Sequence, residues 1–78
     1  MSDLENKVID IIAKQVGKKA DVVKLDSKFA EDLGADSLDL VEMIMTFEEE
    51  FNIEVQDSVA ETLTSVQHVV DHIKKLTE

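Results

Sequence analysis

Ser37 is the residue best placed to take part in chemistry, because it follows Asp36 where an apolar helical pattern begins. Backbone N–H groups and the dipole at a helix N-terminus favour an attached phosphate, and Asp36 is placed to help hold a divalent ion against a phosphate donor. No His lies nearby in the sequence to activate the hydroxyl, and no Gly-x-Ser-x-Gly elbow surrounds it. A Ser in the first turn of a helix also needs no functional explanation. As a functional residue, Ser37 is predicted to accept a covalent modification and not to act as a catalytic nucleophile.

The acidic residues are concentrated in the middle of the chain. Between Phe29 and Ile73 lie 12 of the 18 Asp and Glu residues and no Lys or Arg, and the formal net charge is −10. Such a field repels nucleic acids and anionic lipid head groups and attracts basic proteins. The acids after Ser37 form either an ordinary solvated face or a surface that recognises basic partners. The missing counter-charges at helical spacing favour recognition.

The helix expected after Asp36 carries two apolar stripes on different faces. One has the spacing of a core face and comprises Leu40, Ile44, Phe47 and Phe51, with Met43 beside it. The other is rotated away from it and comprises Leu38, Val41 and Met45. A small bundle needs only one such stripe for its core. The second stripe, surrounded by carboxylates, is therefore predicted to dock partner proteins, although ordinary core packing is the alternative.

No metal site or enzymatic centre is predicted. His68 and His72 have the i, i+4 spacing of a metal pair, but no third ligand accompanies them, so solvent-exposed histidines are expected. The acids lack the spacing of an EF-hand loop. The chain has no Cys and therefore no thiol of its own. Acid, base and nucleophile never converge in the sequence, so we expect no catalysis.

The 78 residues predict a single all-α domain, residues 1–78, built as a small four-helix bundle with three longer helices and one short one. The first helix is expected to begin at the capping box Ser2-Asp3-Leu4-Glu5 and to end near Val16, before Gly17. Residues 18–36 are expected to form a long ordered loop, held by four apolar side chains and with one short turn over residues 29–33. These side chains are Val22, Leu25, Phe29 and Leu33.

The remaining helices are predicted from their caps and apolar spacing. Asp36 is expected to cap the second helix, with Asp39 in its first turn. The short third helix is expected over residues 57–63 with Asp57 as its cap. The last helix is expected to begin at the capping box Thr64-Ser65-Val66-Gln67. Its core face would comprise Val66, Val69, Val70, Ile73 and Leu76.

Three segments of the chain follow a known family pattern. Residues 29–39 read Phe-Ala-Glu-Asp-Leu-Gly-Ala-Asp-Ser-Leu-Asp, followed by Val41-Glu42 and by Phe47-Glu48-Glu49-Glu50-Phe51. With these segments the chain resembles a type II acyl carrier protein of fatty-acid synthesis over nearly its whole length. Peptidyl carriers usually read Leu-Gly-Gly-x-Ser, so Gly34-Ala35-Asp36 favours the fatty-acid branch. Val55-Gln56-Asp57 departs from the common Ile-Pro-Asp and leaves the attachment segment unchanged.

The resemblance implies a cofactor and two surfaces. Ser37 would carry 4′-phosphopantetheine, transferred from coenzyme A by a phosphopantetheinyl transferase, and the terminal thiol of this arm would hold acyl chains as thioesters. Residues lining an acyl pocket would be Leu40, Ile44, Phe47 and Leu63. The surface for basic patches of partner enzymes, called the docking strip below, would comprise Asp36, Leu38, Asp39, Val41, Glu42, Met45 and Glu48.

These observations together predict a monomeric, cytoplasmic carrier that delivers growing fatty-acyl chains to synthesis enzymes, with no nucleic-acid partner and no membrane insertion. The N-terminal residues have no signal-peptide pattern and no apolar run reaches the ~20 residues of a membrane span. The sequence leaves two alternatives open. One is a carrier for another pathway, such as polyketide assembly or D-alanine transfer. The other is an unmodified acidic interaction module, such as an adaptor or a nucleic-acid mimic.

Overall fold

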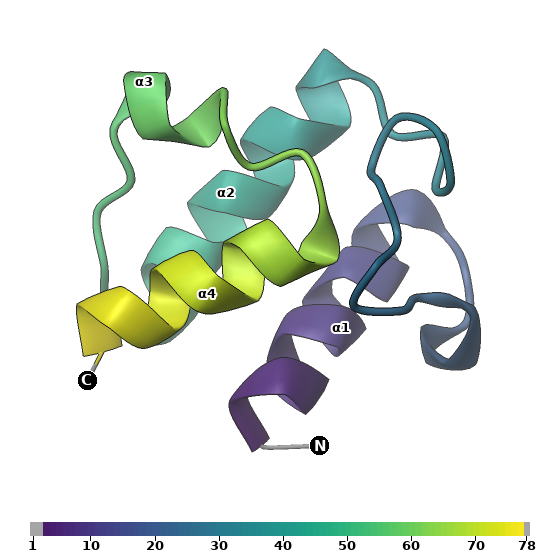
Figure 1. Cartoon of the computed structure of the whole chain (residues 1–78), viewed down its shortest axis with the longest axis horizontal. Helices are drawn as coiled ribbons and strands as arrows, with labels where there is room; N and C mark the ends of the chain where they lie inside the picture. The colour runs from purple at the N-terminus through teal and green to yellow at the C-terminus, as the bar shows by residue number, and fades with distance from the viewer. Residues whose placement is uncertain (1–2, 78) are drawn as a thin grey trace.

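The computed structural model describes residues 3–77 and confirms the predicted all-α, four-helix architecture (Figure 1). The helices are α1 (Asp3–Val16), the 3-10 turn η1 (Ala20–Val22), α2 (Ser37–Phe51), α3 (Asp57–Ala60) and α4 (Val66–Thr77). Between residues 3 and 77 no strand forms, and the one extended pairing is an isolated bridge between Lys28 and Ser65. No helix in this part of the chain is long and apolar enough to cross a bilayer.

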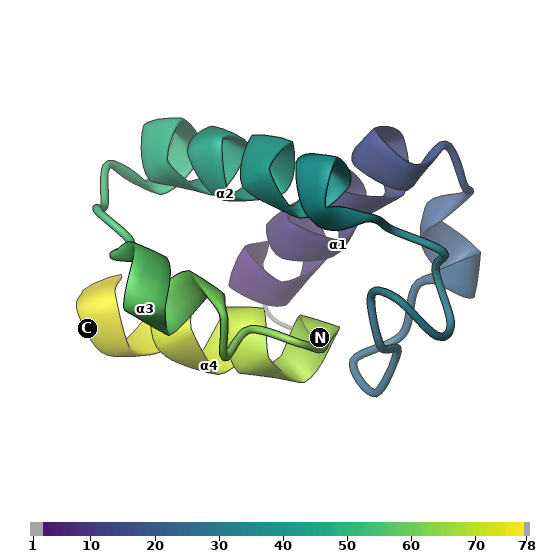
Figure 2. The same cartoon turned by 90° about the horizontal axis from the view of Figure 1, so that it is seen from above.

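Helix α1 packs against both α2 and α4, and the core lies where the three meet (Figures 1 and 2). It buries Val8, Ile9, Ile12 and Ala13, and Leu4 and Ile11 are partly buried beside them. Gly17 follows the helix with φ of +70°, as expected for a left-handed cap. The predicted cap Ser2 lies outside the described residues.

The core face of α2 is centred on Met43 and Phe47, whose exposed fractions are 1% and 2%. Leu40 and Phe51 are half-buried and pack against the core, as predicted, whereas the prediction was wrong for Ile44, which is half-buried and does not join the core. Met43 and Ile44 are neighbours in the sequence and lie at opposite edges of the apolar face. A small rotation of α2 about its axis therefore buries Met43 in place of Ile44. On α4 the prediction holds for Val66, Val69, Val70 and Ile73. It was wrong for Leu76, which is exposed in the last turn.

The loop between α1 and α2 is ordered because it supplies hydrogen-bond partners to the start of α4. The first amides of a helix have no partner within it. Here the Val66 N–H donates to the Ser27 carbonyl at 3.0 Å and the Gln67 N–H to the Leu25 carbonyl at 2.8 Å. The Phe29 N–H donates in turn to the Thr64 carbonyl at 3.1 Å. The loop and the start of α4 therefore stabilise each other.

Apolar side chains complete the attachment of the loop, as predicted, with one correction. Phe29 and Leu33 are buried and Leu25 is half-buried. Val23 takes the buried place predicted for Val22, which is 52% exposed. The turn η1 explains the change, because it rotates Val22 outward and the extended backbone at Val23 inward.

Two predicted helix starts in the second half of the chain were wrong by one residue. Asp57 is the first residue of α3 and not its cap; the capping position belongs to Gln56, whose side chain makes no capping bond, and the helix ends at Ala60. Before α4 the capping hydroxyl is that of Ser65, which accepts the His68 N–H at 3.4 Å. The Gln67 side chain donates to Asp71 instead of completing a capping box.

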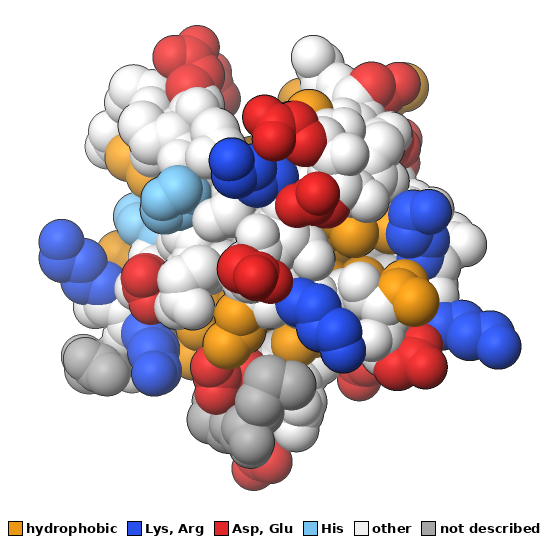
Figure 3. Space-filling model, turned by 45° about the vertical axis from the view of Figure 1, so that its right-hand side comes forward, with side chains coloured by type: hydrophobic (Ala, Val, Ile, Leu, Met, Phe, Trp, Pro, Cys, Tyr) orange, Lys and Arg blue, Asp and Glu red, His pale blue; other side chains and the backbone are white. Residues whose placement is uncertain are grey.

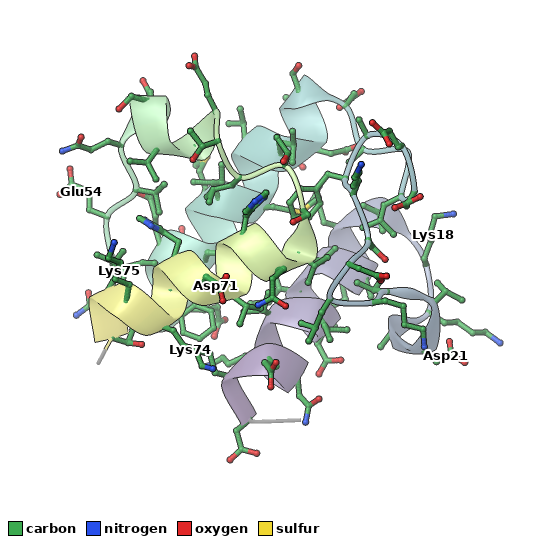
Figure 4. All side chains as sticks on the ribbon, in the orientation of Figure 1. Lys18, Asp21, Glu54, Asp71, Lys74 and Lys75 are labelled. Atoms are coloured by element: carbon green, nitrogen blue, oxygen red, sulfur yellow. The ribbon has the colours of Figure 1, made fainter. Side chains whose placement is uncertain are left out.

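The lysines all lie outside α2, and one of them, Lys7 of α1, pairs with Glu50 of that helix. Figure 4 shows Lys74 and Lys75 towards the end of α4 and Lys18 on the opposite side of the molecule, in the loop after α1. On the face formed by the loop and the start of α4, lysines and carboxylates are interspersed (Figure 3). The ion pairs of the described chain join Lys7 to Glu50 at 3.4 Å and Lys28 to Glu31 at 3.6 Å. All four side chains are at least half exposed, and such pairs contribute little to stability.

We expect millimolar Mg²⁺ to raise the melting temperature of the purified protein. The net charge of −10 opposes the compact state by self-repulsion, and the exposed ion pairs of Glu31 and Glu50 offset little of it. A cation that binds the folded chain more tightly than the unfolded chain stabilises it. Differential scanning calorimetry in MgCl₂, compared with NaCl of equal ionic strength, measures this. Equal melting temperatures in the two salts would exclude a specific effect of divalent ions.

Candidate site for covalent modification and partner docking

The start of α2 is fixed by a reciprocal pair of carboxylates. The Asp39 N–H donates to Asp36 Oδ1 at 2.9 Å, and the Asp36 N–H donates to Asp39 Oδ2 at 3.2 Å. Asp36 has extended backbone angles, as an N-cap residue requires. The prediction of Asp36 as the cap is confirmed. Asp39 does more than was predicted for it, because its side chain also closes the capping box.

Ser37 stands in the first turn of α2 and is exposed. Within residues 3–77, the backbone N–H groups of Ser37 and Leu38 make no hydrogen bond. Two free amides at the positive end of a helix dipole suit a phosphate oxygen. A phosphodiester on the Ser37 hydroxyl therefore fits the site without displacing any side chain from the core.

A hollow of about 470 Å³ opens beside Ser37, between α2 and α3. Its lining comprises Ser37, Leu40, Val41 and Ile44 of α2, with Asp57, Ala60 and Glu61 opposite. Of the four residues assigned to an acyl pocket, the structure brings Leu40 and Ile44 to this hollow. It places Phe47 and Leu63 in the core, and Leu63 also lines a separate hollow beside His68 and His72. The contribution of α3 was not predicted, because amphipathic spacing in α2 does not reveal which segment faces it.

The apolar part of the docking strip is exposed, as its spacing predicted. Leu38, Val41 and Met45 are 66%, 53% and 55% exposed. They are three of the five exposed large hydrophobic residues of the described chain, and they follow one face of a single helix. A row of this kind, bordered by charged side chains, is typical of a surface that binds another protein.

The carboxylates of the docking strip are held by uncharged donors. Besides the Asp36–Asp39 pair, Glu42 Oε2 accepts the Gln15 side-chain amide of α1 at 2.6 Å, and Glu48 Oε2 accepts the Val55 N–H at 3.0 Å. An N–H donor orients a carboxylate without neutralising it. The strip therefore keeps its negative charge for a basic partner. Gln15 and Val55 were missed by sequence reasoning, and Gln15 lies too far from Glu42 in sequence for local spacing to reveal the pair.

The two histidines do not form a metal site with the residues around them. His68 Nδ1 lies 3.1 Å from Ser65 Oγ and 3.2 Å from Thr64 Oγ1, so hydroxyl groups at the start of α4 occupy this nitrogen. His68 is exposed and His72 is half-buried. Between residues 3 and 77 no group of three or more His, Asp or Glu side chains is arranged to hold a metal ion.

Comparison with known proteins adds an independent observation. Residues 6–73 match the family model described as a phosphopantetheine attachment site. The chain is 55% identical over 75 residues to an acyl carrier protein of Buchnera aphidicola, covering 96% of each chain. It is 56% identical to that of Akkermansia muciniphila, covering 97% of this chain and 98% of the other. With that of Clostridium acetobutylicum it shares 57% identity over 72 residues, covering 92% and 94%.

These matches extend over nearly the whole chain, so they concern the bundle and not the Ser37 segment alone. They agree with the resemblance seen in the sequence, and with a structure in which an exposed serine stands beside an apolar hollow and an acidic helix. The chain belongs to the acyl carrier proteins, a family of carriers that hold acyl chains on phosphopantetheine and are not themselves catalysts.

Proposed function

We propose that Ser37 is the attachment residue for 4′-phosphopantetheine and that the chain delivers fatty-acyl thioesters to the enzymes of fatty-acid synthesis. The observation that carries this proposal is the exposed Ser37 hydroxyl in the first turn of α2, next to two amides without acceptors. Asp36, directly before it, is placed to help hold a divalent ion while the arm is transferred from coenzyme A. When attached, the arm supplies the thiol that this chain, which has no Cys, lacks.

The acyl chain would be sheltered first by the hollow beside Ser37. Leu40 and Ile44 offer apolar surface there, within the same hollow that Ser37 lines. Phe47 and Leu63 belong to the core, so they would join the acyl pocket only if α2 moved away from its neighbours. A short chain would therefore contact Leu40 and Ile44, and a longer one would reach Phe47 and Leu63.

The docking strip would bind basic patches on the phosphopantetheinyl transferase and on the synthesis enzymes. Its exposed apolar row gives contact area, and its oriented carboxylates give complementary charge and fast association at low salt. We further propose a monomer made of one domain, residues 1–78, located in the cytoplasm. The net charge of −10 supports the monomer, because two copies of such a chain repel each other.

We expect Glu42→Lys to weaken engagement of the transferase, raising its KM for this chain at low salt by about tenfold or more. The change reverses an exposed charge at the centre of the strip, so attraction of a basic patch becomes repulsion, and such steering changes association rates by about 10-fold or more at low salt. Glu49→Lys is the matched control, since Glu49 is exposed on the same helix but lies outside the strip. Steady-state transfer of the arm from coenzyme A measures both variants, and a thermal melt of each checks the fold. Equal KM values for the two variants would contradict the docking strip.

A further inference from the structure

Glu48 fixes the chain where it leaves α2. Its backbone carbonyl accepts the N–H groups of Asn52 and Ile53, and its side-chain carboxylate accepts that of Val55 at 3.0 Å. Three of the first four amides after the helix therefore depend on one residue. The bonds to the carbonyl are ordinary helix C-capping, whereas the bond to Val55 depends on the identity of the Glu48 side chain.

The helix that follows is weakly attached to the rest of the molecule. Helix α3 has four residues, no side-chain cap and no fully buried residue. Within residues 3–77, none of its backbone or side-chain groups makes a hydrogen bond to α1, α2 or α4. Its position depends on the half-buried Val59 and Ala60 and on the segment leading into it. In Figure 4 the Glu54 side chain of that segment points away from the helices, so it does not replace Glu48 as an anchor.

The position of α3 sets the width of the hollow beside Ser37. Asp57, Ala60 and Glu61 form one wall, and Leu40, Val41 and Ile44 of α2 form the other. Figures 1 and 2 show the segment after α2 returning alongside that helix, which brings α3 back towards the start of α2. Ile53 and Val55 also pack against the core, and Leu63 after α3 is buried, so a change that loosens the segment at Val55 loosens the leading end of this wall.

Glu48 also belongs to the docking strip. It lies three residues after Met45 and seven after Val41, on the same side of α2 as the exposed apolar row, and it is only half-buried. A Lys or Arg of a partner would therefore compete with the Val55 N–H for this carboxylate. The Val55 N–H carries no full charge, whereas a Lys or Arg head group adds the attraction between opposite unit charges to its hydrogen bond, so the cation can displace the amide.

We propose that Glu48 is a latch that couples partner docking to opening of the hollow beside Ser37. In the free protein its carboxylate holds Val55, and through residues 53–56 it holds α3 against α2. When a partner cation takes this carboxylate, the Val55 N–H loses its acceptor and α3 is released. The coupling to docking rests on the proposed function, whereas the latch itself is a property of the free chain.

Amide hydrogen exchange of the free protein, followed by NMR, tests the latch. Glu48→Ala should accelerate exchange of the Val55 amide by about tenfold or more, the equivalent of one hydrogen bond to a charged acceptor, with faster exchange also at Ala60 and Glu61. Glu48→Gln keeps an acceptor oxygen and should restore most of the protection. Glu49→Ala removes the same charge one residue away and should leave Val55 unchanged. The latch is excluded by an unchanged Val55 in Glu48→Ala, or by equal acceleration in Glu49→Ala.

The same measurement with added phosphopantetheinyl transferase, without coenzyme A, tests the release. Binding should shift the α2 resonances of Leu38 and Val41 and accelerate exchange at Val55 in the parent protein. In Glu48→Gln, which offers no charge to the cation, Val55 should stay protected while the complex forms. Shifted α2 resonances with an unchanged Val55 in the parent would overturn the release step. If the α2 resonances do not shift when transferase is added, both the docking strip and the release step are contradicted. The exchange rates of the free variants still decide whether the latch exists.

Discussion

The Ser37→Ala variant is expected to gain no mass when incubated with coenzyme A, Mg²⁺ and a phosphopantetheinyl transferase, whereas the parent protein gains one 4′-phosphopantetheine arm. The substitution removes the only atom to which the arm would be attached. Because Ser37 is exposed and makes no side-chain hydrogen bond, the fold should be retained, with a stability change within about 0.5 kcal/mol. Intact mass spectrometry and circular dichroism of the same sample measure the two effects.

Ser58→Ala is the matched control for this result. Ser58 is also exposed and also stands at the start of a helix, but it lies in α3 and outside the lining of the hollow. This variant should be modified as fully as the parent. A mass gain in Ser37→Ala would show that another residue accepts the arm, and the site proposed at the start of α2 would then be wrong.

Phe47→Ala is expected to reduce the free energy of unfolding by about 3–5 kcal/mol, the usual loss for a buried Phe. The ring is 2% exposed and belongs to the core shared by α1, α2 and α4. Domains of this size have about 5–15 kcal/mol in total, so the variant should be partly unfolded at physiological temperature. Urea denaturation followed by circular dichroism measures the difference.

Phe51→Ala provides the comparison within the same helix. Its ring lies 6.4 Å from that of Phe47, centroid to centroid, and Lys7 Nζ lies 5.2 Å from its centroid. Because Phe51 is only half-buried, this substitution should cost less than Phe47→Ala. An equal or larger loss at Phe51 would mean that the core extends further towards the end of α2 than the burial of these side chains indicates.

Features fixed by local spacing could be predicted from the sequence. The end of α1 before Gly17 and the cap at Asp36 both follow from the preferences of single residues for these positions. The exposed row of Leu38, Val41 and Met45 follows from having more apolar surface on one helix than a small core requires. These are the features that the structure confirms.

Features that depend on a partner far away in the sequence could not be predicted. Periodicity in α2 identified apolar faces but did not reveal that Met43, and not Ile44, is fully buried in the core. The bonds from Gln15 to Glu42 and from Val55 to Glu48 join segments whose proximity arises only in the folded chain. Residue spacing placed Glu48 on a solvated or partner-binding face, and therefore missed that it also holds the segment before α3.

The cofactor is a separate case, because no residue pattern in the chain specifies pantetheine. Spacing and charge indicated a modified serine, an exposed apolar row and an acidic helix. The identity of the arm came from the resemblance and is supported by the family match over residues 6–73. The structure adds the local reason for attachment at this place, namely a solvent-exposed hydroxyl beside two amides without acceptors.

Fragmentation mass spectrometry of the loaded parent protein tests the central claim most directly. The protein is incubated with coenzyme A, Mg²⁺ and transferase and digested with trypsin, and the peptide of residues 29–74, which lies between the cleavage sites after Lys28 and Lys74, is sequenced by fragmentation. We predict that the phosphopantetheine mass lies on Ser37 and on no other residue. An unmodified peptide, or the same mass on Ser58 or Ser65, would contradict it.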